Sequence, residues 1–251
     1  MKARCSPTVT SGAARAVEML EAAADERVAR QARAYFKSQD DAVFFGVRAP
    51  KVREIERRIY GLVKKAWSAS EAVRFADMMI RRKQLEAKAV GILLLSRYSR
   101  SFDETLLAAV RGWLAAGYCS NWATTDLLST AVLAGLLKRH PRLLEDFKRW
   151  TASESLWVRR AAAVSLTPLA RRGEHLDTAY GVASALLDDR EDLIHKAVGW
   201  LLRECGKADA RRLESFLLEN GPRIPRTALR YAVERFAPAR RRRLLERTRP
   251  G

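Results

Sequence analysis

Residues 121–126 read Asn-Trp-Ala-Thr-Thr-Asp, which places an indole ring and a carboxylate four positions apart. If the segment is helical, Trp122 and Asp126 are i and i+4 neighbours and share one face. A ring beside a carboxylate suits a cationic sugar, because the ring can hold a deoxyribose while the carboxylate faces its anomeric carbon. The pair predicts chemistry at a glycosidic carbon. The alternative is that Trp122 packs in a core and Asp126 is a surface acid or ion-pair partner.

A further indole breaks a repeated pattern. Three segments, which begin at Lys88, Arg160 and Lys196, read KAVGILL, RAAAVSL and KAVGWLL, and their starts differ by 36 residues or a multiple of 36. Trp200 stands where the other two segments have an aliphatic residue. Departures from a repeat's own pattern are where function is expected, so Trp200 becomes a second candidate for contact with the sugar. A core position is again the alternative.

The same segments place bases at equivalent positions. Each begins with one, at Lys88, Arg160 and Lys196. Equivalent positions in stacked repeats lie along one face. If that face is concave, a basic stripe follows its inside and can track a phosphate backbone without regard to base sequence. Otherwise these bases are surface charges without a ligand, and Arg160 pairs with an acid such as Glu154.

The elements that must position these residues are helices, because apolar residues recur at three- and four-residue spacing and alternating strand patterns are absent. A period near 36 to 40 residues is that of a two-helix repeat unit. We therefore predict an all-α fold, a curved α-solenoid with a basic concave face. It forms a single repeat domain over 21–248, after a partly disordered N-terminal segment over 1–20. The expected helices cover 12–37, 50–66, 69–80, 83–99, 102–117, 120–139, 141–150, 154–170, 175–187, 191–206, 209–219, 223–236 and 238–248.

The charge of the chain favours a polyanionic partner. Its 251 residues include 47 Lys and Arg against 29 Asp and Glu, a net charge of +18. Such a surplus is typical of nucleic-acid binding, and arginine, which outnumbers lysine 36 to 11, matches phosphate with a planar fork. A GC-rich genome would explain arginine over lysine but not the surplus. The run of four arginines at 240–243, with Arg247 and Arg249, contacts DNA or is a frayed, solvated end.

Several classes of protein are disfavoured. An apolar fraction of 48% argues against disorder. No run of about 18 apolar residues predicts a membrane span, and the N-terminus lacks the apolar block of a secretory signal. Three cysteines outside any C-x-x-C pair (Cys5, Cys119 and Cys205) indicate a reducing cytoplasm. Three distant histidines show no metal-ligand spacing, so we expect no metal.

Four motifs occur in order along the chain: F-F-G-V-R-A-P-K-V-R (44–53), N-W-A-T-T-D (121–126), L-W-V-R-R-A-A (156–162) and K-A-V-G-W-L-L-R-E (196–204). Together they resemble the AlkD family of DNA alkylation-repair glycosylases, which are built from HEAT-like helical repeats. The resemblance runs from about Tyr35 to about Phe236 and implies about six HEAT-like two-helix repeats. One departure is Ala123, since the residue after the first tryptophan is often acidic in the family.

The resemblance also implies roles for particular residues. The family's catalytic carboxylate falls on Asp126, and its two sugar-cradling tryptophans fall on Trp122 and Trp200. Its phosphate-contacting arginine falls on Arg160, and a tyrosine at the N-terminal end of its cleft falls on Tyr35. The other side chains predicted to contact DNA are Lys88, Arg159, Lys196, Arg203, Arg48 and Lys51.

The implied activity is hydrolysis of the N-glycosidic bond of cationic alkylated purines in duplex DNA, without base flipping and without a cofactor. The implied protein is a monomer of the bacterial cytoplasm, associated with the nucleoid when bound to DNA. A second reading is a non-catalytic module that binds damaged, distorted or branched DNA, as some members of the family do. A third is a protein-interaction solenoid whose basic groove holds an acidic peptide. Asp126 together with both tryptophans favours the enzyme.

Overall fold

The structure is a computed structural model that describes residues 7–36 and 42–249. Cys5 lies outside these ranges. Apart from one isolated bridge between Val43 and Gln84, the regular elements of the described residues are all helical. This confirms the predicted all-α fold class, and consecutive helices pack against one another as in an α-solenoid. Within the same ranges no helix combines the length and the apolar character that crossing a bilayer requires.

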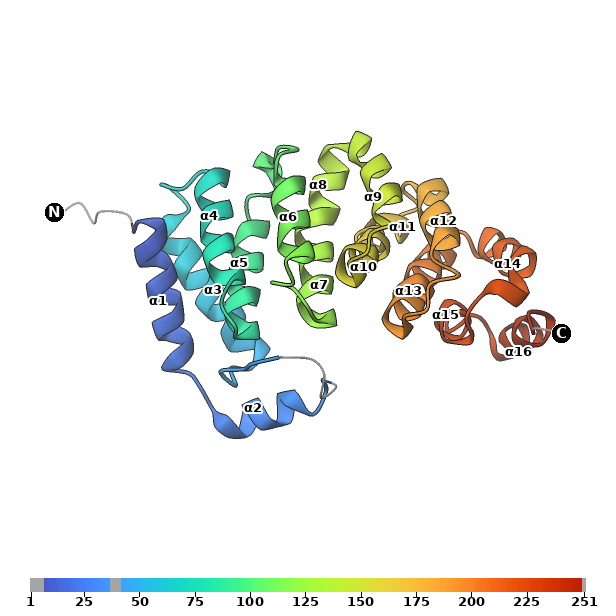
Figure 1. Cartoon of the computed structure of the whole chain (residues 1–251), viewed down its shortest axis with the longest axis horizontal. Coiled ribbons are helices and arrows are strands. Elements are labelled where there is room, and N and C mark those ends of the chain that lie inside the picture. The colour runs from blue at the N-terminus through green and yellow to red at the C-terminus, as the bar shows by residue number, and fades with distance from the viewer. Residues whose placement is uncertain (1–6, 37–41, 250–251) are drawn as a thin grey trace. The chain divides into compact units, whose positions relative to one another are not determined.

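The chain divides into two compact units, Met1–Arg139 and His140–Gly251, which we call unit 1 and unit 2. In Figure 1 the elements of unit 1 run from blue to green. They are α1 (Val9–Glu21), α2 (Glu26–Arg33), α3 (Ala49–Val63), α4 (Ala69–Ile80), α5 (Leu85–Ser96), the 3-10 turn η1 (Ser99–Ser101), α6 (Leu106–Ala115), α7 (Trp122–Leu128), the π-helical turn η2 (Ser129–Leu133) and α8 (Ala134–Arg139).

Unit 2 runs from yellow-green to red in Figure 1. Its elements are η3 (Pro141–Leu143), α9 (Leu144–Trp150), α10 (Leu156–Val164), α11 (Thr167–Ala170), α12 (Leu176–Ala185), α13 (Asp192–Ala208), α14 (Ala210–Glu219), η4 (Gly221–Arg223), α15 (Arg226–Ala232) and α16 (Pro238–Arg247).

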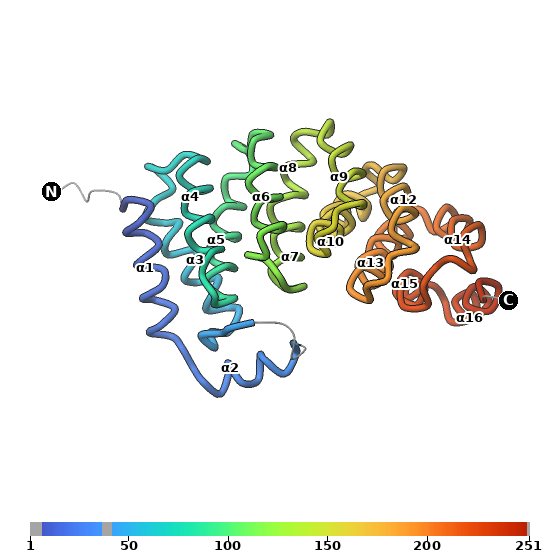
Figure 2. Tube along the Cα trace, in the orientation of Figure 1, coloured from blue at the N-terminus to red at the C-terminus, as the bar shows by residue number. Residues whose placement is uncertain are grey.

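Each unit has a core formed by one central helix and its neighbours. In unit 1, α5 packs against α3 and α4, and α1 packs against the same two helices. In unit 2, α13 packs against α10, α11, α14 and α15. Figure 2 shows α2 running crosswise to α1 and α3, not alongside them. Four other tryptophans pack within the two units: Trp67, Trp113 and Trp150 are buried, and Trp157 is half-buried.

Small residues after the repeated base let the helices approach closely. Gly91 and Gly199 both stand three positions after a base of the repeat, at Lys88 and Lys196. A Cβ at Gly91 would lie 2.7 Å from Cβ of Met79, and one at Gly199 would lie 2.6 Å from the carbonyl oxygen of Ala228. These distances are below van der Waals contact, so the glycine in KAVG is needed for the α5–α4 and α13–α15 contacts.

The N-terminal region differs from the expected division. The predicted N-terminal segment 1–20 includes most of α1, which packs into unit 1 and buries Ala16 and Leu20. The helix expected over 12–37 is interrupted, because the side chain of Asp25 accepts hydrogen bonds from the backbone N–H groups of Arg27 and Val28. Asp25 thereby caps a separate helix, α2. The structure also places a boundary at residue 139, inside the single domain expected over 21–248.

Candidate nucleic-acid site

The N-W-A-T-T-D motif forms the start of α7, and its residues fall into two groups. The side chain of Asn121 caps the helix by accepting a hydrogen bond of 2.9 Å from the backbone N–H of Thr124. The Thr125 hydroxyl donates to the carbonyl oxygen of Cys119 at 2.7 Å, and both threonines are buried. Trp122 remains 39% exposed and Asp126 is half-buried one turn later. The polar positions fix the helix start, while the two candidate residues share its more exposed face.

An aromatic neighbour supports Trp122. Its ring stacks on Phe36, with centroids 5.3 Å apart and planes 17° from parallel. Phe36 in turn lies 5.3 Å from Phe44 at a tilt of 60°. These three rings, Phe36, Phe44 and Trp122, form what we call the aromatic cluster. Stacking against a ring restricts the indole at lower entropic cost than a flexible aliphatic neighbour would.

A buried carboxylate holds the segment that carries Phe44. Glu86, on α5, accepts hydrogen bonds of 2.9–3.1 Å from the backbone N–H groups of Phe45, Gly46 and Val47. Gly46 has a φ of +84°, and a Cβ there would lie only 1.9 Å from the carbonyl oxygen of Asp25. The F-F-G-V part of the first motif is therefore a turn that requires glycine and is fastened to α5.

The helix changes its hydrogen bonding three residues after Asp126. Residues Ser129–Leu133 form a π-helical turn between α7 and α8. The Thr130 hydroxyl donates to the carbonyl oxygen of Asp126 at 2.7 Å. Single π-turns inserted in α-helices are frequent at functional sites, because they change the direction of the side chains around them. Here the turn falls within one helical turn of the candidate carboxylate.

Lys88 does not lie where we expected it. It is only 9% exposed, and its Nζ donates to the carbonyl oxygens of Ile80 at 2.7 Å and Tyr118 at 2.6 Å. Burial lowers the pKa of its ammonium. Because two backbone acceptors occupy the ammonium, this placement does not favour contact with a phosphate. Lys88 instead joins the end of α4 to the loop before α7.

The repeated arginine of unit 2 is placed in the same way. Arg160 is 5% exposed and donates to the carbonyl oxygen of Leu193, at the start of α13. Its acceptor lies 33 residues ahead, about one repeat, as Tyr118 lies 30 residues ahead of Lys88. The first two bases of the repeat thus tie successive repeats together. A phosphate could be contacted only by the N–H groups of Arg160 that its bonds to the protein leave over, through the small part of the side chain that is exposed.

The other expected bases of unit 2 are paired to different degrees. Arg159 donates to Asp189 at 2.6 Å and to two backbone carbonyls, and its side chain is largely buried. Arg203 bonds Glu234. Lys196 is more exposed and pairs with Asp192 one turn earlier on α13, at 2.8 Å. Of the three repeated bases, Lys196 has the most exposed side chain.

Trp200 lies on α13, one turn after Lys196, and is half-buried. The neighbouring Gly199 packs against α15, which turns the adjacent positions of α13 away from that contact. Trp200 therefore retains exposed surface on a helix that also contributes Ile194, Leu201 and Leu202 to the core of unit 2.

Unit 1 brings Tyr35 and Arg48 to one hollow. Tyr35 is 81% exposed just after α2, and both side chains line an open hollow of about 570 Å³. A neighbouring apolar pocket of about 320 Å³ is lined by Arg48, Phe44 and Leu127, the residue after Asp126. Lys51 is exposed and pairs with Glu54 at 3.0 Å. Arg48 thus lies between the predicted tyrosine and the helix that carries the predicted carboxylate.

Nucleophilic thiol chemistry is disfavoured. Burial raises the pKa of both Cys119 and Cys205 to about 12, so neither is a thiolate at neutral pH. No group of three His, Cys, Asp or Glu side chains in residues 7–36 and 42–249 is arranged to hold a metal ion.

Three supporting residues were not found from the sequence. Phe36 stacks on Trp122, Phe44 packs at a tilt against Phe36, and Glu86 accepts hydrogen bonds from the turn that follows Phe44. Phe44 belongs to a motif that was identified, but no periodicity relates Phe36 to a residue 86 positions later. An acid within the apolar α5 is the one signal that could have indicated Glu86, since a buried carboxylate needs donors.

Comparisons with known proteins agree with this architecture. The sequence model of the family described as "DNA alkylation repair enzyme" matches residues 16–236. A solved structure described as a predicted DNA alkylation repair enzyme from Enterococcus faecalis superposes with a TM-score of 0.75 at 18% identity, over 86% of this chain and 97% of that one. A search of curated proteins gave no match.

Two further solved structures are similar. The smu.31 protein of Streptococcus mutans UA159 has a TM-score of 0.57 at 17% identity, over 87% of this chain and all of that one. The alkylpurine DNA glycosylase AlkC of Pseudomonas fluorescens, bound to DNA containing an abasic site analog, has a TM-score of 0.52 at 14% identity, over 96% of this chain and 69% of that one. At such identities these three structures show a shared fold.

Proposed function

The chain belongs to the DNA alkylation repair enzyme family, and on that premise we propose that it is a DNA glycosylase that removes cationic alkylated purines from duplex DNA. The observation that carries the proposal is the start of α7, where exposed Trp122, stacked on Phe36, and half-buried Asp126 lie one turn apart. The similar AlkC structure, a glycosylase bound to DNA, supports a DNA partner.

The chemistry follows from the charge of the lesion. A purine alkylated at N3 or N7 is cationic, so it takes the electron pair of the N-glycosidic bond and leaves as a neutral base. Positive charge then builds on the deoxyribose. The Asp126 carboxylate stabilises that oxocarbenium-like state by its charge and orients the attacking water. Water bonds to the anomeric carbon and gives up a proton, which leaves an abasic sugar in an intact strand.

Trp122 contacts the deoxyribose in this proposal, and the π face of an indole favours a cationic sugar over a neutral one. Catalysis comes from groups that interact more strongly with the cationic transition state than with the ground state. Because the leaving base is already activated, the reaction does not require extrusion of the base into a recognition pocket, in contrast to most glycosylases. We propose that the base is released without flipping.

The experiment that tests the function is base release. Wild-type protein is incubated with methylated duplex DNA, and free 3-methyladenine and 7-methylguanine are measured together with abasic sites and strand breaks. The expected result is release of methylated purine and abasic sites in unbroken strands, with unmethylated DNA left intact. DNA binding without any release of methylated base would refute the glycosylase and favour a non-catalytic module for damaged or distorted DNA.

A further inference from the structure

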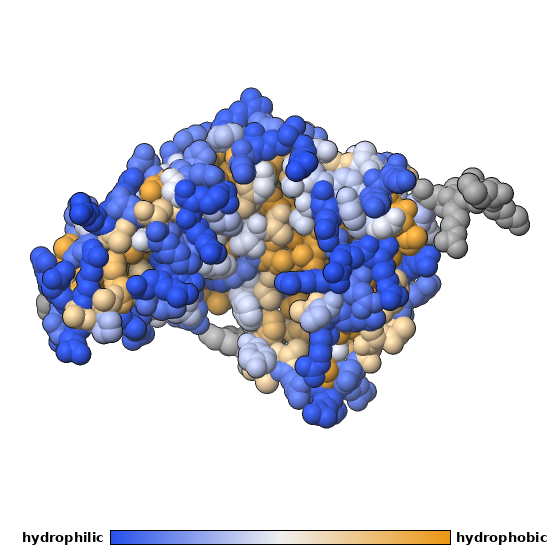
Figure 3. Space-filling model, turned by 180° about the vertical axis from the view of Figure 1, so that it is seen from behind, coloured by the Kyte–Doolittle hydropathy of each residue, from blue (hydrophilic) through white to orange (hydrophobic). Residues whose placement is uncertain are grey.

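The positive surplus of unit 2 is confined to its C-terminal part. Between residues 140 and 210 the chain has 11 basic and 11 acidic side chains, which cancel. Between residues 211 and 251 it has 12 arginines and four acids, a surplus of eight. In Figure 3 the C-terminal elements, at the left, are covered mainly by hydrophilic residues. The electrostatic attraction of this unit for a polyanion therefore comes from α14–α16 and their connections.

The C-terminal arginines stand on a docked helix, not on a frayed end. α16 packs against α14, and its Leu244 is fully buried. The Thr248 hydroxyl donates to the carbonyl oxygen of Leu244 at 2.7 Å. Arg226, from α15, donates to the carbonyl oxygen of Leu245 at 3.1 Å. These bonds hold the last turn of the helix, which is the end that would otherwise unwind first.

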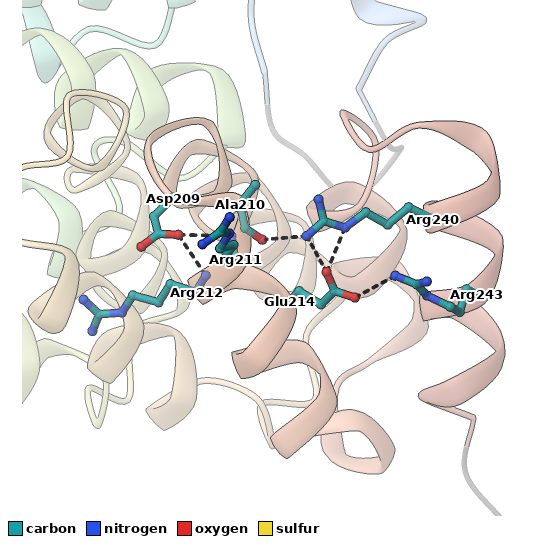
Figure 4. A network of polar contacts seen from close by, with 7 residues as sticks. All are labelled: Asp209, Ala210, Arg211, Arg212, Glu214, Arg240 and Arg243. Atoms are coloured by element: carbon teal, nitrogen blue, oxygen red, sulfur yellow. Dashed lines mark hydrogen bonds and ion pairs between the residues drawn. The ribbon is translucent and has the colours of Figure 1, made fainter.

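The run of four arginines is divided between two tasks. Figure 4 shows the Glu214 carboxylate of α14 between Arg240 and Arg243 of α16. Arg240 Nε donates to Glu214 at 2.8 Å and Arg243 at 3.1 Å. Arg241 and Arg242, which fall between them in the sequence, are exposed. In the part of the chain that the structure describes, neither of these two forms an ion pair, although Arg241 lies near enough to Glu234 to help lower the pKa of that carboxyl. One pair docks the helix and the other faces solvent.

The sides of α16 that remain exposed fit a phosphate backbone better than a bilayer. A helix that lies on a membrane needs a free apolar face, but Leu244 is buried against the protein and Leu245 is half-buried. The exposed positions carry arginine forks, which match phosphate oxygens. Five further arginines after residue 210 are exposed, and their side chains form no ion pair or hydrogen bond with the described residues: Arg211, Arg230, Arg235, Arg247 and Arg249.

We propose that the exposed arginines of α16, Arg241 and Arg242 foremost, bind the phosphate backbone of duplex DNA as a surface separate from the α7 residues that carry the chemistry. The choice of DNA as the polyanion rests on the proposed function. Contacts with phosphates do not depend on base sequence, and they release counterions from the DNA. The slope of log affinity against log salt concentration therefore measures how many such contacts form.

The test compares three double variants of the full chain on an undamaged duplex. Arg241→Ala/Arg242→Ala removes the exposed pair. Arg100→Ala/Arg111→Ala removes two exposed arginines of unit 1 and matches the change in net charge. Arg240→Ala/Arg243→Ala removes the pair that docks α16. Affinity is measured against salt concentration, and thermal melting is recorded for each variant.

For Arg241→Ala/Arg242→Ala we expect the slope of log affinity against log salt to fall by about 1.8, so that wild type gains about tenfold more affinity between roughly 200 and 50 mM salt. Its melting temperature should equal that of wild type. Arg100→Ala/Arg111→Ala should leave the slope nearly unchanged, and Arg240→Ala/Arg243→Ala should lower the melting temperature. An unchanged slope in the first variant, or an equal fall in the Arg100/Arg111 control, would overturn the proposal.

Two further readouts distinguish this proposal from the proposed glycosylase activity and from binding to a membrane. The salt slope is measured on undamaged DNA, without turnover. A protein that releases no base can therefore still lose part of its salt slope in Arg241→Ala/Arg242→Ala. Conversely, a protein that releases base can keep the same slope in that variant. Vesicles with anionic headgroups form the second arm. Binding to them that depends on Arg241 and Arg242, with an unchanged DNA slope, would refute DNA as the partner.

Discussion

At the scale of single residues, the candidate site depends on how Trp122 is held. The indole is 39% exposed and has one stacked neighbour, Phe36. An exposed aromatic ring that must contact a sugar gains from such a neighbour, because the orientation it needs in the complex is already favoured in the free protein. Phe36 is therefore a positioning residue for Trp122.

Removing this stack should slow excision more than it destabilises the protein. Phe36→Ala deletes an aromatic pair of about 0.5–1.5 kcal/mol, which predicts a fall in the rate of base release of about 2- to 13-fold. Phe36 is half-buried at the end of α2, so the melting temperature should change little. Phe36→Tyr keeps the ring and is the control. Equal losses in both variants, or none in either, would contradict the role.

The buried ammonium of Lys88 also leads to a prediction, which concerns the stability of the protein. Lys88→Met leaves the carbonyl oxygens of Ile80 and Tyr118 without their donor. The free energy of unfolding, measured with urea, should fall by about 2–3 kcal/mol. Lys83→Met is the control, since Lys83 is exposed just before α5.

The salt dependence of DNA affinity distinguishes a structural role of Lys88 from a contact with phosphate. If the ammonium serves only the two carbonyls, Lys88→Met leaves the slope of log affinity against log salt unchanged. A fall of about 0.9 with little loss of stability would instead show that Lys88 contacts a phosphate, as its position in the repeat predicted.

The repeat predicts that its bases occupy equivalent positions on one face, but it does not predict whether their side chains point to solvent or into the protein. KAVG and RAAA place a base before small residues. The small residues are there for close helix packing, and the same packing buries the neighbouring base among backbone carbonyls. Sequence spacing establishes equivalence between Lys88 and Arg160, and the structure bears that out by giving both a carbonyl acceptor about one repeat ahead. Only coordinates show that this equivalent role is structural.

At the scale of elements, most helices could be predicted because their apolar spacing is regular, whereas interruptions depend on polar details. The helix expected over 120–139 is nearly continuous in the structure, from α7 through α8, but contains a π-turn at Ser129–Leu133. A π-turn adds one residue to a helical turn, and the spacing of apolar residues does not reveal this change. The break before α2 depends on a single cap, Asp25, which follows a run of alanines that favours helix.

The docking of α16 predicts a dependence on pH at the same scale. Hydrogen bonds from Arg240, and then from Arg243, hold the pKa of Glu214 below its ordinary value of 4.5. A carboxylate whose pKa is lowered by folding stabilises the folded state above the ordinary pKa, and that contribution is lost as the pH falls through the lowered value. Protection of the α16 amides against hydrogen exchange should therefore decline as the pH drops below about 4.5.

A variant shows whether Glu214 is the group that titrates. Glu214→Gln should lower the protection of α16 at neutral pH and remove the decline below the ordinary carboxyl pKa. Glu219→Gln, on the same helix and exposed, should behave as wild type. A decline of equal size in Glu214→Gln would show that another carboxylate is responsible.

At the scale of the whole molecule, the net charge of +18 is carried by both units, eight of it by the end of unit 2 and ten by unit 1. Composition predicted a polyanionic partner, but it could not show which of the basic side chains are exposed. Many of the bases are committed to carboxylates or to backbone carbonyls, among them Arg159, Arg203 and Arg240. Affinity for DNA should therefore depend on the smaller set of bases that stay exposed.

The proposed activity rests on one side chain, and Asp126→Asn tests it most directly. The amide keeps the shape of the carboxylate but not its charge. Single-turnover release of 7-methylguanine from methylated duplex DNA should fall by about 10²- to 10⁴-fold. Glu18→Gln, an exposed acid on α1, makes the same chemical change elsewhere and should match wild type.

Affinity for the same duplex, measured beside the rate, completes the test. We predict that Asp126→Asn binds DNA as tightly as wild type, because the carboxylate acts on the charge that develops as the glycosidic bond breaks. Release of 7-methylguanine at the wild-type rate by Asp126→Asn would contradict the account.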